Sequence, residues 1–409
     1  MCAHSSVTSA FYGNGFVLYT IVISLGIMSG ILNFEWLNNI AVMMSDAFIK
    51  IFKCLSLPLI SLSMIVTITS YHSDMQMKRI SQKTLCYTLV TTVTAAMVAC
   101  GLYVLIDPTT PQMISLGDDI PPIRDISYLQ HISQLIPSHI FEPFMEHNVM
   151  SVLLMAIVTG SAIRFIPDSR HREVISSFFQ GLHSIFITLT RWVIKIIPLA
   201  LYSFIAVTVI QLRKGLDISG IGEYLAIVIL ANAVQGLVVL PLWLRWQGIS
   251  PFQTMCKVMP ALSIAFFSKS STGTLPMTIQ CAEKNLKVSP GIAQFVLPLC
   301  TTINMNGCAA FIFSTVIYLS QSHGIEITFM TMISWIIIAT IAAIGNAGVP
   351  MGCFFLSASL LSSMGVPLTL LGLILPFYSI IDMIETSLNV WSDVCVTQVI
   401  DRKFKEHVK

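Results

Sequence analysis

Long apolar stretches alternate with short polar ones along the whole chain. Five of them are long enough to cross the roughly 30 Å of a bilayer's hydrocarbon core as helices. They lie near residues 14–33, 45–70, 84–106, 222–246 and 297–320. Residues 148–165 and 175–212 are slightly more polar, and an eighth stretch at about 370–401 carries acidic side chains. The pattern predicts an all-α polytopic membrane protein with eight transmembrane helices.

Two further apolar stretches, at about 258–283 and 332–361, are interrupted at their centres by small and polar residues. The first reads Ser268-Lys-Ser-Ser-Thr-Gly-Thr-Leu-Pro276, and the second reads Gly345-Asn-Ala-Gly-Val-Pro-Met-Gly352. Non-helical backbone at membrane depth is tolerated only where it lines a cavity or is buried in protein. We therefore expect two re-entrant helical hairpins, one entering from each face of the membrane.

The composition agrees with a membrane protein. The chain has 409 residues, of which 55% are hydrophobic and 10% are charged, and its mean hydropathy is +0.80. An average soluble domain has roughly 25% charged residues. The net charge of +2 is too small to indicate a nucleic-acid partner. The N-terminus lacks the charged region and cleavage site of a secretory signal, so we expect the first apolar stretch to remain as a membrane anchor.

The ten cysteines are scattered through apolar segments without metal-ligand spacing. We expect them to be small buried hydrophobic residues, in preference to disulfides or metal ligands.

Charges in the loops predict the orientation. Lys78, Arg79 and Lys83 indicate a cytoplasmic loop, and the acidic segment between Asp107 and Asp125 indicates the opposite side. With both hairpins re-entrant, the basic C-terminal tail also reaches the cytoplasm. We expect a cell (inner) membrane protein whose N- and C-termini are both cytoplasmic.

Polar side chains form a stripe on the final apolar stretch, which has no basic residue between positions 371 and 400. At about 100° per residue, one helix face carries Asp382, Glu385, Thr386, Asn389 and Asp393. Placing a carboxylate in hydrocarbon costs several kcal/mol of free energy unless it has a partner. This face must therefore contact cations, a polar ligand or water. We therefore expect this helix to carry the functional site of the protein.

Four motifs follow one another in the last part of the chain. They are Ser270-Ser-Thr-Gly-Thr-Leu-Pro276, Thr302-Ile-Asn-Met-Asn-Gly307, Gly345-Asn-Ala-Gly-Val-Pro350 and Asp382-Met-Ile-Glu-Thr-Ser-Leu-Asn-Val-Trp-Ser-Asp393. In this order they resemble the dicarboxylate/amino acid:cation symporter family, the glutamate-transporter homologues. The final motif is similar to that of the serine/threonine:sodium symporter branch.

The resemblance implies an elevator fold, in which a mobile transport domain moves across a static scaffold that is usually trimeric. Residues 1–75 would form scaffold helices 1–2, and residues 76–110 would form helix 3 of the transport domain. Residues 111–215 would hold an extracellular loop and scaffold helices 4–5. Residues 216–409 would complete the transport domain with helix 6, the first hairpin, helix 7, the second hairpin and helix 8.

The resemblance also implies a substrate site. Asp382 would hold the substrate ammonium, and Asn389 with the backbone N–H near Ser271 would hold the α-carboxylate, at a helix N-terminus that favours anions. Glu385 and Thr386 would face the substrate side chain. The other implied substrate-binding residues are Ser270, Thr272, Val349 and Gly352.

Sodium ions are the implied coupling cations, and no other cofactor is expected. One would lie between Asp393 and backbone carbonyls near Cys300, Asn304 and Asn389, and oxygen ligands suit such a hard cation. A second would use Thr302 and carbonyls near Ala343, Ile344 and Asn346. A third would use Thr91, Thr92, Asn304 and Asn306. Most of the family has Asp in the position of Asn306, so fewer coupled cations are plausible here. Ordinary helix–helix hydrogen bonding is the alternative role of Thr91 and Thr92.

Glu385 indicates which class of substrate the site would accept. Where acidic-substrate members are expected to have an arginine, this carboxylate would repel a substrate carboxylate and accept a hydrogen bond from a hydroxyl. The sequence therefore predicts sodium-coupled symport of a small neutral amino acid, similar to serine or threonine. A sodium- or proton-coupled glutamate, aspartate or dicarboxylate symporter and a cationic amino-acid symporter remain alternatives. In another alternative, Glu385 pairs with Lys269 and never meets the substrate.

Two other classes of protein use buried carboxylates. A cation channel would line its pore with them, but it needs no pair of opposed hairpins. An intramembrane aspartyl hydrolase needs two facing acids, and Asp382 and Asp393 lie about 16 Å apart along one helix. The chain is therefore not expected to be an enzyme.

Overall fold

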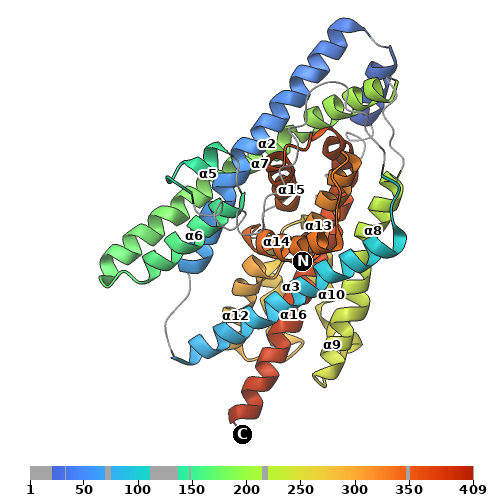
Figure 1. Cartoon of the computed structure of the whole chain (residues 1–409). Coiled ribbons are helices and arrows are strands. Elements are labelled where there is room, and N and C mark those ends of the chain that lie inside the picture. The colour runs from blue at the N-terminus through green and yellow to red at the C-terminus, as the bar shows by residue number, and fades with distance from the viewer. Residues whose placement is uncertain are drawn as a thin grey trace, which may run out of the picture.

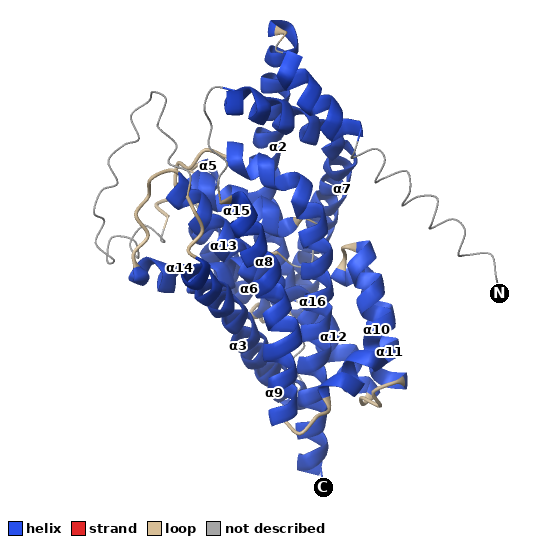
Figure 2. Ribbon diagram, turned by 90° about the vertical axis from the view of Figure 1, so that its right-hand side faces the viewer, coloured by secondary structure: helices blue, strands red, loops and turns tan. Residues whose placement is uncertain are grey.

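The computed structural model describes residues 21–32, 34–69, 75–110, 137–146, 149–213, 220–346 and 351–408, and all regular elements within them are helices (Figure 2). This agrees with the predicted all-α class. In chain order the labelled helices are α2 (Glu35–Thr69), α3 (Met75–Ile106), α5 (Glu142–Met145), α6 (Val149–Arg164), α7 (Ser169–Arg213), α8 (Ile221–Val234), the π-helix η1 (Gln235–Val239), α9 (Leu240–Trp246), α10 (Pro251–Ser268), α11 (Ser271–Lys284), α12 (Pro290–Ile303), α13 (Asn306–Ser322), α14 (Phe329–Gly345), α15 (Gly352–Ser363) and α16 (Thr369–Val408).

Five helical segments of the described residues are long and apolar enough to cross a membrane. They are Arg79–Ile106, Ser169–Ile210, Ile221–Trp246, Pro290–Ser322 and Thr369–Lys405. Shorter apolar helices occur at Ile21–Leu32, Leu57–Thr69, Ser151–Arg164, Phe329–Gly345 and Gly352–Ser363. These segments overlap the apolar stretches expected from the sequence, and they support an integral membrane protein.

The helices pack around α13 (Figure 1). This helix contacts α3, α8, α14, α15 and α16, and nearly all of its residues are buried, from Asn306 to Ser320 without exception. On the other side of the molecule α2 packs against α6 and α7. A helix that is apolar around its whole circumference is stable only when other helices surround it. The core therefore centres on α13.

The apolar stretch at 297–320 lies within the span Pro290–Ser322, as expected, but it contains a helix break that the sequence pattern did not predict. Helix α12 ends at Ile303 and α13 begins at Asn306, with Asn304 and Met305 between them in non-helical backbone. The backbone groups freed by such a break must find other partners. Here the break turns the amide side chains of Asn304 and Asn306 toward α16.

The two stretches with polar centres do contain helix breaks. Helix α10 ends at Ser268 and is followed by Lys269, whose φ of 53° is left-handed; Ser270 caps α11 by accepting a hydrogen bond from the Gly273 N–H at 3.0 Å. Serine is a favoured N-cap residue because its hydroxyl satisfies such an orphan N–H group. Helix α14 ends at Gly345, and α15 begins at Gly352. Helices α10 and α11 pack against each other and against α16.

Candidate functional site

A small polar cavity lies where the breaks in these helices meet α16. It is lined by Lys269, Ser271, Met305, Cys308, Asn346, Asp382, Glu385, Thr386 and Asn389. The cavity measures about 10 Å³, which is room for about one water molecule. A larger ligand can enter only if the surrounding helices move.

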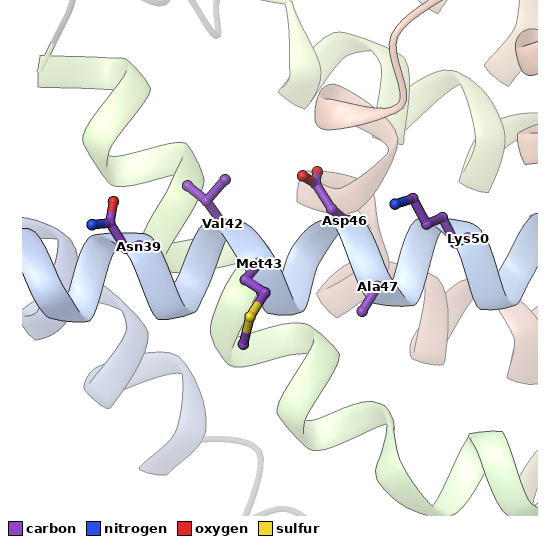
Figure 3. Close-up of a pocket in the computed structure, with 6 residues that line it drawn as sticks. All are labelled: Asn39, Val42, Met43, Asp46, Ala47 and Lys50. Carbon is purple, nitrogen blue, oxygen red and sulfur yellow. The ribbon is translucent and has the colours of Figure 1, made fainter.

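A larger hollow, of about 460 Å³, lies on the outer face of α2 (Figure 3). It is lined by Asn39, Val42, Met43, Asp46, Ala47 and Lys50. All of these residues come from one helix, and the hollow is open. It has none of the converging polar groups from several helices that the cavity at α16 has, so the α16 cavity is the candidate site.

Asp382 is buried, with 6% of its surface exposed. The backbone of Met351 hydrogen-bonds to its carboxylate, but Oδ2 has no hydrogen-bond partner among the described residues. The charge of Lys269 acts on this carboxylate, and the Lys269 Nζ donates a hydrogen bond to Ser379 Oγ at 2.5 Å. Asp382 therefore presents an unsatisfied oxygen to the cavity.

Glu385 is also buried and has one free oxygen. The Tyr378 hydroxyl donates to Oε2 at 3.4 Å, and Oε1 has no partner among the described residues. Within the part of the chain that the structure describes, Glu385 and Lys269 form no ion pair. The alternative in which Lys269 neutralises Glu385 is thus not what the structure contains.

The amide of Asn389 has a fixed orientation. The Gly307 N–H, at the start of α13, donates to Asn389 Oδ1 at 2.9 Å, which turns Nδ2 toward Met305 Sδ at 3.5 Å and the cavity. Helices α13 and α16 approach closely here, because a Cβ at position 307 would lie 2.7 Å from the Cα of Glu385. Glycine at this position therefore allows the contact that presents an N–H donor to the site.

The predicted substrate-binding residues are only partly brought together. Ser271, Asp382, Glu385, Thr386 and Asn389 line the cavity. Ser270 caps α11, Thr272 is exposed, and Gly352 lines a neighbouring cavity against Asn346. Val349 lies outside the described residues. Met305, Cys308 and Tyr378 also belong to this region, and no polar pattern in the sequence singles them out.

Asp393 lies deeper along α16 and is 1% exposed. Asn304 Nδ2 donates to its Oδ1 at 2.9 Å, and Thr301 Oγ1 donates to its Oδ2 at 3.4 Å. Two hydrogen bonds from neutral donors leave a buried carboxylate short of a counter-charge. Asn304 was predicted to accompany Asp393, and the helix break at this residue is what brings its side chain there.

The residues of the predicted third cation site are already hydrogen-bonded to one another. Thr91 Oγ1 and Asn306 Nδ2 donate to Asn304 Oδ1 at 3.0 and 2.9 Å, and Gln235 Nε2 donates to Asn306 Oδ1 at 2.7 Å. Thr92 is buried, and its hydroxyl has no partner among the described residues. Thr91 thus makes the helix–helix hydrogen bond considered as its alternative role. Gln235, which was not among the predicted residues, belongs to the π-helical turn η1.

The residues of the predicted second sodium site come from two helices in contact, α12 and α14. The Thr302 hydroxyl donates to the Leu299 carbonyl at 2.8 Å, so its lone pairs stay available. Ala343 and Ile344 lie in the last turn of α14, and Asn346 follows at its C-cap, where its backbone N–H donates to the Ala343 carbonyl at 3.1 Å. The Cys300 thiol is buried on α12.

The cysteines depart from the expectation of small, buried, unpaired residues in two ways, because Cys54, Cys86 and Cys256 are exposed and one pair is joined. Cys308 on α13 and Cys353 on α15 pair as a disulfide, 45 residues apart in sequence. Linear spacing does not show this pairing, because it depends on two different helices meeting at the cavity. The other described cysteines are free: Cys54, Cys86, Cys100, Cys256, Cys281, Cys300 and Cys395.

The chemistry of the site favours cations. Three buried carboxylates, of Asp382, Glu385 and Asp393, lie on one face of α16, whereas Lys269 is the one basic side chain among the residues that line the cavity. Burying carboxylates without counter-charges is costly, so cationic ligands would stabilise them. An ammonium group at Asp382 and a metal cation at Asp393 both fit this arrangement.

The chain is similar in sequence to known membrane transporters. The sequence model of the sodium:dicarboxylate symporter family matches residues 16–403 of this chain. The chain is 29% identical over 252 residues to the neutral amino acid transporter B(0) of Rattus norvegicus, which is 61% of this chain and 45% of that protein. It is 30% identical over 264 residues to the putative sodium-dependent excitatory amino acid transporter glt-4 of Caenorhabditis elegans, or 64% and 52% of the two chains.

A longer match covers 384 residues of the neutral amino acid transporter B(0) of Bos taurus at 24% identity, which is 85% of this chain and 70% of that protein. In the two matches above, the aligned part is about half the length of the relative. The names of these relatives describe transporters, and none of the three names an enzyme.

Proposed function

The chain belongs to the sodium:dicarboxylate symporter family, and from this premise we propose that it is a secondary active transporter that couples sodium to the uptake of a small neutral amino acid. Relatives named neutral amino acid transporters support the neutral substrate. The observation that carries the proposal is Glu385, a buried carboxylate in the cavity with one unpaired oxygen.

Asp382 would bind the substrate ammonium with its unsatisfied Oδ2. The Asn389 amide N–H, whose orientation Gly307 fixes, would bind the α-carboxylate together with the backbone N–H of Ser271. Ser271 is the first residue of α11, a position where free N–H groups and the helix dipole favour an anion. A zwitterion held in this way directs its side chain toward Glu385 and Thr386. Ser270, Thr272, Val349 and Gly352 remain proposed members of the site, supported by the family pattern.

Glu385 would determine which substrate side chains the site accepts. Its free oxygen accepts a hydrogen bond from a serine or threonine hydroxyl, and its charge disfavours a second carboxylate in a desolvated cavity. Lys269 reaches Ser379, which leaves Glu385 without a paired cation among the described residues. A neutral, hydroxyl-bearing amino acid therefore fits best, and a cationic side chain is the competing substrate.

We propose two sodium sites. One uses the Asp393 carboxylate with carbonyls near Cys300, Asn304 and Asn389, and the other uses Thr302 with carbonyls near Ala343, Ile344 and Asn346. The third site, of Thr91, Thr92, Asn304 and Asn306, is less suited to a cation, because N–H and O–H donors already occupy the side-chain oxygens of Asn304 and Asn306.

The movement would follow the elevator pattern of the family. Packing of α2 against α6 and α7 supports a scaffold formed by residues 1–75 and 111–215, and packing of α3 against α8 and α13 supports a transport domain formed by residues 76–110 and 216–409. Eight transmembrane helices, two re-entrant hairpins, a homotrimer and cytoplasmic termini in the cell membrane belong to the same proposal.

Uptake into proteoliposomes tests this function. With sodium and proton gradients imposed separately, a panel of labelled amino acids should show concentrative, sodium-driven uptake of serine or threonine. Asp46→Asn on the exposed face of α2 is a matched carboxylate control and should transport normally. Uptake that never raises the internal concentration above equilibrium would favour a channel. If aspartate or lysine inhibits the uptake most strongly, the substrate is an acidic or a cationic amino acid.

A further inference from the structure

Two sulfur atoms and a carboxylate meet at one wall of the candidate cavity. Cys308 comes from α13, Cys353 from α15 and Glu385 from α16, and their ligand atoms lie within 4.8 Å of one another. All three residues are buried, and Glu385 Oε1 has no partner among the described residues. The three groups belong to three different helices, so tertiary packing alone gathers them.

The surroundings of the sulfur atoms favour negative charge on them. The Asn346 side-chain amide points Nδ2 at Cys308 Sγ and Cys353 Sγ, at 3.0 and 3.3 Å. The Asn389 Nδ2 lies 3.7 Å from Cys308 Sγ. Amide N–H groups that donate to sulfur stabilise a thiolate more than a neutral thiol, as second-shell donors do around metal-bound ligands.

We propose that, with the disulfide reduced, Cys308, Cys353 and Glu385 bind one thiophilic divalent cation such as Zn²⁺ or Cd²⁺. Two thiolates and one carboxylate are a ligand set that zinc accepts, with a fourth position left for water. Reduction by an added phosphine supplies two electrons, and two protons from water complete the two thiols. Metal binding then forms two metal–sulfur bonds and releases both protons, with no further change of oxidation state.

Charge balance favours this exchange. Two protons leave the dithiol as one divalent cation enters, so the net charge of the cavity does not change. A buried site tolerates such an exchange better than the addition of an uncompensated charge. The unpaired oxygen of Glu385 gains a partner at the same time.

A cation at this place would occupy groups that also face the candidate substrate cavity, since Cys308 and Glu385 line it. Metal binding and amino-acid binding should then exclude each other. This consequence rests on the proposed function, whereas metal binding itself does not.

Cadmium binding to the purified full chain tests the site directly. After phosphine reduction and desalting without oxygen, titration with Cd²⁺ should produce the ultraviolet thiolate-to-cadmium charge-transfer band with one equivalent bound. Cys308→Ser and Cys353→Ser should each lose most of this band, and Glu385→Gln should weaken Cd²⁺ binding by at least about tenfold. Cys100→Ser, which removes a buried free thiol on α3, is the matched control and should keep the band.

A reduced wild-type protein without the band, or a Cys308→Ser/Cys353→Ser double variant that retains it, would overturn the proposal. Cys308→Ala and Cys353→Ala repeat the test without burying a new hydroxyl. Sodium-driven uptake measured with and without Cd²⁺ distinguishes the metal-site proposal from the proposed substrate position beside Glu385. If the band is normal and uptake is unaffected, the metal site stands and the placement of substrate beside Glu385 is wrong.

Discussion

Replacing Asp382 by Asn gives the sharpest test of the substrate site. The change keeps the shape of the side chain and removes its charge, so the substrate ammonium would enter a buried site without a counter-charge. Asp382 is 6% exposed, and solvent therefore cannot replace the lost carboxylate. The nearby Lys269 ammonium, no longer balanced, would in addition repel the substrate.

Removing one partner of a buried, hydrogen-bonded charge pair costs about 2–5 kcal/mol. At about 1.4 kcal/mol per factor of ten, the Kd for serine or threonine should rise roughly 30-fold to several thousand-fold. The low exposure of Asp382 and the proximity of Lys269 place the expected effect in the upper half of that range.

Calorimetric titration at saturating sodium measures this change. The assay includes the hydroxy acid that matches each amino acid but has no α-amino group. The wild type should prefer the amino acid strongly, and Asp382→Asn should lose that preference. A variant that binds serine or threonine within threefold of the wild type, or that still prefers the amine, would refute the assigned role of Asp382. Asp46→Asn serves as the carboxylate control, and thermal unfolding checks that each variant is folded.

Four further changes test other parts of the site. Glu385→Arg should shift the preference toward aspartate by about tenfold or more in competition uptake, because a guanidinium binds a carboxylate bidentately; continued preference for serine would contradict this. Asp393→Asn should reduce the sodium-dependent rise in melting temperature, because it removes one of the two proposed sodium sites, and an undiminished rise would exclude Asp393 as a sodium ligand. Asn306→Asp should increase the number of coupled sodium ions, measured from reversal potentials, since it supplies the missing carboxylate; an unchanged number would count against the third-site argument. Gly307→Ala should destabilise the protein by about 1–3 kcal/mol, because its Cβ would lie 2.7 Å from the Glu385 Cα, whereas Gly101→Ala on α3 meets no atom within 4 Å and should melt near the wild type.

Much of the site could be predicted because it lies on one helix. The spacing of Asp382, Glu385, Thr386 and Asn389 depends only on helical periodicity, and all four line the cavity. The break at Ser270 was likewise predictable from small and polar residues in an apolar stretch. These are local properties, and the sequence contains them completely.

Other features required contacts between segments far apart in the sequence. Gln235 faces Asn306 from a π-helical turn, and Cys308 meets Cys353 only because α13 and α15 pack together. No spacing along the chain indicates either contact. The break at Asn304 was missed as a helix end because its flanking residues are as apolar as those of a continuous span.

The sequence by itself determined that this chain lies in a membrane, that two of its apolar stretches break at their polar centres, and which face of its last helix is polar. It did so because hydrocarbon excludes charge and unpaired backbone, and both constraints act on local sequence. Tertiary structure alone decided which oxygen atoms of that face stay unpaired. Thr91 and Gln235 on neighbouring helices donate to Asn304 and Asn306, whereas Asp382 and Glu385 each keep a free oxygen, because these hydrogen-bond partners are set by proximity in space and not along the chain.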